Sequence, residues 1–168
     1  MNDHAAKGEE PVAEGTIEYG VERGLPVEEF IDVLRRSTLA ERRPVADRGR
    51  IAKMLAQADL VVTARRDGVL VGVARALTDY CYCTYLSDLA VDVAVQRQGI
   101  GRELLRRTHE LAGRETMLVL LAAPQARSYY PHVGLRQHDS CWIGDRTEKP
   151  AAEKTVPEKP VPESPVGE

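Results

Sequence analysis

The residues with the clearest chemical meaning are two glycines, Gly99 and Gly101, in the middle of the chain. They follow an alternating apolar stretch that ends at Val95 and precede an amphipathic helical pattern. The first N–H groups of a helix have no partners within the helix, and the helix dipole adds partial positive charge there. Small residues at such a turn let the main chain approach a phosphate closely. The pattern predicts an anion site, and we expect a nucleotide-like cofactor.

A pair of cysteines, Cys81 and Cys83, is the second feature with chemical potential. No second pair of ligands at zinc spacing accompanies it, so we expect no metal site and interpret both cysteines as small buried side chains. The cysteine count is odd, at three, and the first residues carry no apolar signal core. These observations predict reduced thiols and a cytoplasmic location.

Length and composition limit what kind of protein must position the glycine turn. The chain has 168 residues, of which 43% are hydrophobic and 29% charged, values typical of one globular domain. The net charge is −3 and the arginines are scattered among acidic residues, which argues against a nucleic-acid partner. Apolar runs stay shorter than the ~18 residues of a membrane span, so we expect no membrane partner.

The first half of the chain predicts a strand followed by two helices. Alternating residues predict a strand over Thr16–Val21, and helical spacing of apolar residues predicts a helix over Pro26–Ser37. A second helix includes Ile51 and ends near Gln57. The helix-to-helix segment Thr38–Val45 between them is a candidate for a mobile, substrate-facing flap, with a solvated connector as the alternative.

The second half predicts strands on both sides of the glycine turn. The apolar run Met117–Ala122 predicts a strand covered on both faces, parallel to the strand before the turn. In chain order the further expected elements are strands Leu60–Arg65 and Val69–Leu77 joined at Asp67-Gly68, a strand Cys81–Val95, a helix Gly99–Gly113, a short helix Gln125–His132 and a last strand Leu135–Ile143.

The two ends of the chain differ in composition from this central part. Residues 1–14 are polar and without periodicity, and we expect a flexible arm. Residues 147–168 are rich in Pro, Glu and Lys, which predicts a disordered tail. The domain is therefore expected over residues 15–146.

The order of elements and two sequence blocks resemble the GNAT superfamily of N-acetyltransferases. The segment Gln96–Gly101, QRQGIG, fits the family's Q/R-x-x-G-x-G/A signature, and Ala126–Tyr130 with Val133–Leu135 is similar to its second block. Leu135 departs from the usual Phe. The resemblance covers residues 15–146 and implies an α/β fold, the GNAT acyl-CoA N-acyltransferase fold, with a mixed, mostly antiparallel sheet and flanking helices. A dinucleotide-binding turn would need a third glycine, where this chain has Leu104.

The resemblance implies acetyl-CoA as cosubstrate and assigns residues to it. Backbone N–H groups from about Arg97 to Arg102 would hold the pyrophosphate, and the strand before the turn would align the pantetheine arm. A main-chain N–H near Leu89 would face the thioester oxygen. The implied cofactor-binding residues are Leu89, Ala90, Val91, Gln96, Arg97, Gln98, Gly99, Ile100, Gly101 and Arg102.

The resemblance also implies an acid and a base. Tyr130 lies where the family has the acid that protonates the departing thiolate, while Tyr129 would be a packing aromatic. Tyr85, Ser87 and Asp88 occupy the positions at which relatives carry the base. Asp88 has an alternative role in capping a strand bulge, and a base acting through water is a further alternative.

These assignments together predict an enzyme that transfers an acetyl group to a primary amine by direct transfer in a ternary complex. The alternative is a non-catalytic acetyl-CoA-binding sensor or scaffold. The acceptor, a small molecule or a peptide amine, is left open: Arg42 and Arg43 would suit an anionic acceptor, and Asp79, Asp88 and Asp139 a cationic one. Dimers are frequent in the family, so a homodimer is among the expected states.

Overall fold

The computed structural model describes residues 15–144, which form two compact units divided between Leu121 and Ala122. The arm over residues 1–14 and the tail over residues 147–168 lie outside the described residues. The first unit holds, in chain order, β1 (Ile17–Val21), α1 (Val27–Arg36), a 3₁₀ helix (Leu39–Arg42), α2 (Arg48–Ala56), β2 (Leu60–Arg66), β3 (Val69–Thr78), β4 (Cys83–Val91), a 3₁₀ helix (Val93–Val95), α3 (Ile100–Ala112) and β5 (Met117–Val119). The second unit holds a 3₁₀ helix (Pro124–Ala126) and α4 (Tyr129–His132).

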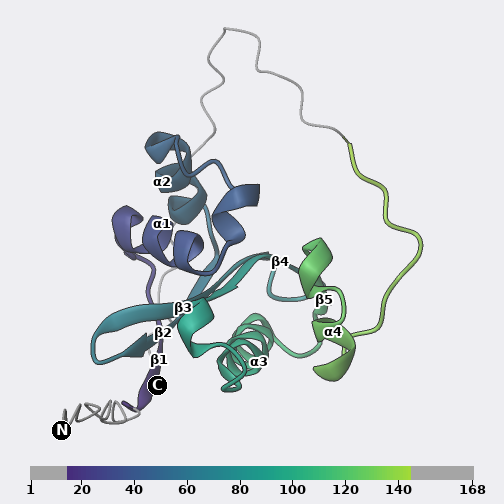
Figure 1. Cartoon of the computed structure of the whole chain (residues 1–168). Coiled ribbons are helices and arrows are strands. Elements are labelled where there is room, and N and C mark those ends of the chain that lie inside the picture. Colours follow the sequence, from purple (N-terminus) through teal and green to yellow (C-terminus); the bar gives the residue numbers. More distant parts are fainter. Residues whose placement is uncertain (1–14, 145–168) are drawn as a thin grey trace, which may run out of the picture. The chain divides into compact units, whose positions relative to one another are not determined.

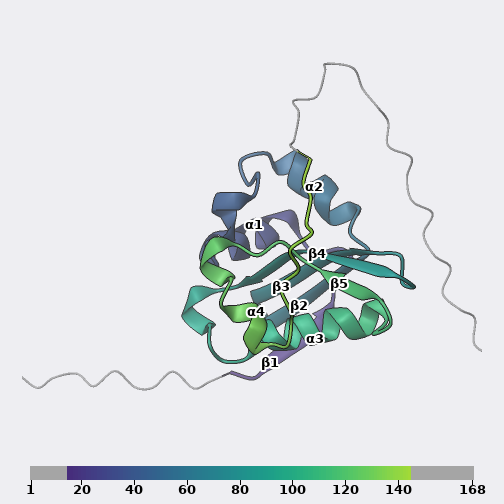
Figure 2. The same cartoon turned by 90° about the vertical axis from the view of Figure 1, so that its right-hand side faces the viewer.

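The first unit is built on one five-stranded sheet in the order β1-β2-β3-β4-β5. Neighbouring strands are antiparallel except for β4 and β5, which are parallel. Helices α1 and α2 lie on one face of the sheet and α3 on the other, in both views (Figures 1 and 2). The α/β fold with a mixed, mostly antiparallel sheet and flanking helices is therefore confirmed.

Helix α1 is favoured by the charges at its two ends and by its apolar face. Glu28 and Glu29 lie in its first turn and Arg35 and Arg36 in its last, which complements the helix dipole. Its apolar face, which includes Phe30 and Leu34, is fully buried against the sheet. Each such side chain contributes roughly 1.5–3 kcal/mol through its removal from water.

Helix α3 packs closely on the opposite face. It begins after Gly99, whose φ of 83° lies in the left-handed region. Gly72 of β3 lies beneath it, and a Cβ at this position would be 3.0 Å from Leu104 and 3.2 Å from Ile100. The close approach of sheet and helix therefore depends on the absence of a side chain at Gly72.

Several sequence predictions about the strands after residue 80 are wrong. The strand predicted over Cys81–Val95 ends at Val91, because the carboxylate of Asp92 accepts the N–H of Ala94 and starts a 3₁₀ helix. The run predicted over Met117–Ala122 gives only a three-residue strand, and Met117 and Val119 are 55% and 40% exposed rather than covered. β5 is the last strand of the sheet and pairs along one edge only.

Two further predictions fail near the end of the described chain and at the cysteines. Leu135–Ile143 forms no strand in the described structure, and Trp142 and Ile143 are exposed, because no neighbouring strand pairs with this polar-rich stretch. Cys81 and Cys83 are exposed and free, since they lie in the turn before β4 and at its first residue rather than inside a strand.

Among the described residues, no helix is long and apolar enough to cross a bilayer.

Candidate active site

A bulge interrupts β4 at Ser87. Arg75 of β3 pairs with Asp88 and the next residue, Ala76, pairs with Leu86, so Ser87 is an extra residue on β4. A bulge of this kind bends its strand and redirects the side chains that follow. The residues predicted as candidate bases, Tyr85, Ser87 and Asp88, therefore surround one irregularity of the strand.

One edge of β4 is open beyond the bulge. β5 pairs with Cys83, Thr84 and Tyr85, and within residues 15–144 no strand pairs with this edge from Leu86 onward. Leu89, Ala90 and Val91, predicted to align the cofactor, belong to this open stretch. Main-chain groups along an unpaired edge can bind an extended ligand as though it were a strand.

The carboxylate of Asp88 is buried between two arginines. Nε of Arg43 donates to Oδ1 and Nε of Arg75 donates to Oδ2. Asp88 is 1% and Arg75 5% exposed. Burial of a charge is tolerated when it is paired and hydrogen-bonded, as this one is. The arrangement agrees with the alternative role for Asp88, that of holding the bulge.

Tyr85 and Ser87 have different surroundings from Asp88. Tyr85 is 37% exposed, so its ring is accessible from solvent. Ser87 is half-buried, and its Oγ accepts a hydrogen bond from Nη2 of Arg75 at 2.7 Å. Of the three candidate bases, Tyr85 is the most accessible.

The glycine turn connects β4 to α3 through a segment with left-handed backbone. Arg97 has a φ of 64° and Gly99 a φ of 83°, both in the left-handed region. Gln96 donates through Nε2 to the main-chain oxygen of Val91 at 3.0 Å, and Arg66 donates through Nη2 to Oε1 of Gln98 at 2.5 Å. These contacts attach the turn to the end of β4 and to β2.

The start of α3 leaves main-chain donors for a ligand. The first intrahelical bond runs from the N–H of Glu103 to the oxygen of Gly99, and no side chain of residues 15–144 caps this end. The N–H groups of Ile100, Gly101 and Arg102 therefore have no acceptor within the helix. A Cβ at Gly99 would meet no atom within 4 Å, so the space beside this residue is open. This geometry fits an anion such as a pyrophosphate.

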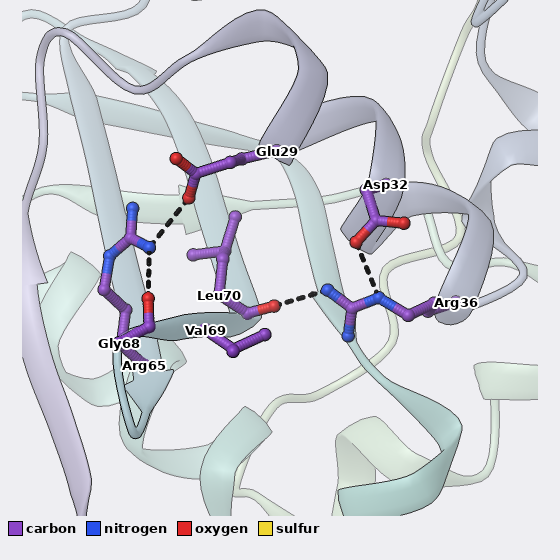
Figure 3. A pocket seen from close by; sticks show the side chains of 7 residues that line it. All are labelled: Glu29, Asp32, Arg36, Arg65, Gly68, Val69 and Leu70. Carbon is purple, nitrogen blue, oxygen red and sulfur yellow. Dashed lines mark hydrogen bonds and ion pairs between the residues drawn. The ribbon is translucent and has the colours of Figure 1, made fainter.

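A hollow of about 260 Å³ lies between α1 and the β2–β3 hairpin (Figure 3). Arg65 donates to Glu29 at 2.7 Å and to the oxygen of Gly68 at 2.8 Å. Arg36 donates to Asp32 at 2.8 Å and, with other nitrogens, to the oxygen of Leu70 and to Asp92. The predicted site residues do not line this hollow; its lining residues are Glu29, Asp32, Arg36, Arg65, Gly68, Val69 and Leu70.

Two of the charged groups predicted to attract an acceptor are already engaged. Arg43 donates through Nη2 to the main-chain oxygen of Ser87 at 2.5 Å, in addition to Asp88. Oδ1 of Asp79 accepts the N–H groups of residues 81–83, and these hydrogen bonds lower the pKa of Asp79 well below its usual range. Both groups hold the chain in shape: Arg43 is committed to β4, and Asp79 keeps its charge at an exposed position.

The second unit contains the predicted acid. Tyr129 and Tyr130 open α4, and their rings meet edge to face with centroids 5.4 Å apart. Both are half-buried. Tyr130 thus belongs to the second unit, whereas Tyr85, Ser87 and Asp88 lie together on β4 of the first.

Comparison with known proteins identifies the family. A model of the Acetyltransferase (GNAT) domain matches residues 32–145, more than half of the chain. The chain belongs to the GNAT acetyltransferase family. Its class as an enzyme, an N-acetyltransferase, follows from this membership. A comparison with curated proteins gave no match.

Solved structures of other acetyltransferases share the fold of this GNAT domain. The aminoglycoside acetyltransferase meta-AAC0020 from an uncultured soil metagenomic sample is 22% identical, with a TM-score of 0.62 over 79% of this chain and 97% of that one. The ribosomal-protein-alanine N-acetyltransferase from Brucella melitensis biovar Abortus 2308 is 18% identical, with a TM-score of 0.61 over 78% and 99%. The aminoglycoside N-acetyltransferase AAC(6')-Iy, in complex with CoA, is 15% identical, with a TM-score of 0.59 over 85% and 99%.

Sequence reasoning missed one important residue of the site, Arg75, and gave Arg43 a different role. A signal for Arg75 was present, because it interrupts the apolar run of β3, VLVGVARALT. A charged residue inside a buried strand needs a buried partner of opposite charge. That requirement points to an acidic residue on a neighbouring strand, and Asp88 supplies it.

Proposed function

We propose that this GNAT domain transfers the acetyl group of acetyl-CoA to a primary amine by direct transfer in a ternary complex. The observation that carries the proposal is the open edge of β4 from Leu86 to Val91, which continues through the glycine turn into the uncapped start of α3. An unpaired strand edge followed by a helix N-terminus suits a long ligand with an extended amide arm and a pyrophosphate. CoA has this form.

The glycine turn would hold the pyrophosphate through main-chain N–H groups of residues 97–102. Arg97 and Gly99 have left-handed backbone, a conformation found in main-chain anion-binding turns. The solved complex of AAC(6')-Iy with CoA supports this choice of cosubstrate for a related fold. Side chains at these positions would matter less than the backbone conformation.

Main-chain groups of Leu89, Ala90 and Val91 would bind the pantetheine arm, and an N–H near Leu89 would face the thioester oxygen. Attack of an amine on a thioester places negative charge on that oxygen. A fixed N–H donor at this position contributes on the order of 3 kcal/mol to lowering the barrier. The bulge at Ser87, which bends the strand just before them, would set the direction of these main-chain groups.

The chemical step requires that protons leave the amine and reach the sulfur. An amine with a pKa of about 10 is mostly protonated at neutral pH. We assign to Tyr85, the most accessible candidate, the orientation of a water that takes the proton from the amine. The nitrogen then forms its bond to the acetyl carbon, the carbon–sulfur bond breaks, and Tyr130 gives its phenolic proton to the departing thiolate. The second proton of the amine nitrogen leaves to water as the neutral amide forms, and a proton from water restores the phenol of Tyr130.

The acceptor classes to test come from proteins of similar fold. Those proteins are named for aminoglycosides and for the alanine of a ribosomal protein. The panel therefore contains aminoglycosides, peptides with an N-terminal alanine, and polyamines. Release of free thiol from acetyl-CoA, measured with each amine, is the test, and turnover with any amine above the rate without amine is expected.

The alternative is an acetyl-CoA sensor without catalysis. Its distinguishing result is thermal stabilisation of the protein by acetyl-CoA with no thiol release for any amine. Absence of both stabilisation and turnover would contradict the proposal and the alternative together.

A further inference from the structure

The carboxylate of Asp88 is already fully engaged inside the protein. Each of its two oxygens accepts a hydrogen bond from a guanidinium group, Oδ1 from Arg43 and Oδ2 from Arg75. Its side chain has no exposed surface. A general base needs an oxygen that a substrate proton can reach. Asp88 does not offer such an oxygen in this arrangement.

The other nitrogens of the two arginines hold the bulge itself. Nη2 of Arg43 donates to the main-chain oxygen of Ser87 at 2.5 Å. Nη2 of Arg75 donates to Oγ of Ser87 at 2.7 Å. The extra residue of the bulge is thus held through its main chain and its side chain at once, and the next residue through its carboxylate.

The same arginines connect the bulge to the helices on one face of the sheet. Arg43 follows the 3₁₀ helix Leu39–Arg42, within the helix-to-helix segment Thr38–Val45. Nη1 of Arg75 donates to the main-chain oxygen of Met54 in α2 at 3.3 Å. The segment Thr38–Val45, a candidate from its sequence for either a substrate-facing flap or a solvated connector, is therefore tied to β4 and cannot move independently of it while these bonds persist.

We propose that Asp88 is a positioning residue, and that Arg43, Arg75 and Asp88 form a buried clamp. The clamp holds the Ser87 bulge and the helix-to-helix segment in one arrangement, so that this segment and the main chain of β4 from Leu86 to Val91 keep a fixed relation. This inference rests on the proposed function, since the arrangement that the clamp fixes is the one that acetyl transfer would use.

The first test removes Arg43, so that the two remaining members of the clamp, Arg75 and Asp88, carry opposite charges. Arg43→Ala leaves Asp88 paired with Arg75, so we expect a folded protein. Loss of fixed geometry lowers kcat for the best amine by about tenfold to a hundredfold, with the KM for acetyl-CoA unchanged. Arg43→Lys keeps the charge without the planar fork and restores only part of the rate. Arg48→Ala is the matched control, because Arg48 pairs with Glu28 at an exposed site, and we expect parental kinetics.

The second test separates a clamp from a base. If Asp88 accepted the proton, Asp88→Asn would cost about 10²–10⁴ in kcat while Arg43→Ala, which frees one oxygen, would leave kcat intact. With a clamp, the two variants lose kcat to a similar extent, and the double variant is no slower than the slower single variant. Additive losses, or a parental kcat in Arg43→Ala, would overturn the clamp.

Amide hydrogen exchange gives a readout that needs no turnover and no Asp88→Asn protein. In Arg43→Ala we expect faster exchange in peptides that cover residues 38–47 and 84–91, and parental exchange in β2. Unchanged exchange in both peptides would overturn the clamp. If the parent acetylates no amine in the panel, the proposed function fails, and the exchange result alone decides on the clamp.

Discussion

Two adjacent tyrosines in α4 are distinguished by the role that family resemblance gives each of them. Their rings contact edge to face, with an interplanar angle of 71°. Replacement of either by Phe keeps the ring and its packing and removes only the hydroxyl. The pair therefore offers its own matched control for the assignment of the acid.

We expect Tyr130→Phe to lower kcat by about a hundredfold, at the low end of the range for loss of a general acid. The thiolate is a moderate leaving group, so its departure without a proton is slow but not abolished. Acetyl-CoA affinity, measured by calorimetry, should remain parental. Tyr129→Phe should retain nearly full kcat. Equal kcat in the parent and Tyr130→Phe would contradict the assignment.

At the level of single residues, the sequence predicts which residue types could act but not what they contact. Asp88 stands out as an acidic residue within the strand before the glycine turn, yet its partners come from 45 and 13 positions earlier in the chain. Only the folded sheet brings Arg43, Arg75 and Asp88 together. The conformation of Gly99, in contrast, follows from local rules, because a glycine before a helix is the residue that accepts a positive φ.

At the level of elements, the predictions that depend on local sequence are correct, and those that depend on pairing with distant strands are wrong. Helices α1 and α3 follow from the periodicity of apolar residues within one stretch of sequence. The β2–β3 hairpin follows from Asp67-Gly68, whose residues both have positive φ. The strand over Leu135–Ile143 is wrong because a strand needs a partner, and partners are not a local property. The shortness of β5 and the unpaired edge of β4 also depend on which strands pair, so local sequence does not predict them.

The packing of α3 on β3 allows a prediction at this scale. In Gly72→Ala the new Cβ would be 3.0 Å from Leu104, 3.2 Å from Ile100 and 3.4 Å from Ala64, all within a buried layer. We expect the free energy of unfolding, measured with urea, to fall by about 1–3 kcal/mol, because overpacking must displace the helix or its side chains.

Gly20→Ala is the matched control for Gly72→Ala. Gly20 lies in β1, and a Cβ there would have its nearest neighbour outside the adjacent residues, Oγ1 of Thr63, at 3.7 Å, which is an ordinary contact. Its stability should be unchanged or raised by up to about 1 kcal/mol through the unfolded state. Equal free energies of unfolding for the two variants would show that α3 can move away from the new Cβ without loss of stability.

At the level of the whole molecule, stability toward acid depends on carboxylates that form ion pairs in the folded state. Hydrogen bonds from Arg106 lower the pKa of Glu103 to about 2, and hydrogen bonds from Arg65 lower that of Glu22. Hydrogen bonds from Arg114 lower the pKa of Glu110. A carboxylate with a lowered pKa in the folded state stabilises the protein above its unfolded pKa and loses that contribution as pH falls through the folded value.

Glu103→Gln tests this dependence at one position. The ordinary pKa is 4.5 and the folded value about 2, so the stability that Glu103 adds is present above pH 4.5 and disappears as the pH falls to 2. Its side chain is 28% exposed and pairs with Arg106 and Arg107 on the surface of α3, which limits the contribution to about 1 kcal/mol. Thermal melts of the parent and Glu103→Gln should therefore differ at pH 7 and converge at pH 2, whereas Glu18→Gln, an exposed position on β1, should follow the parent throughout. A difference between parent and Glu103→Gln that persists undiminished at pH 2 would mean that the glutamate acts through packing on α3 rather than through its charge.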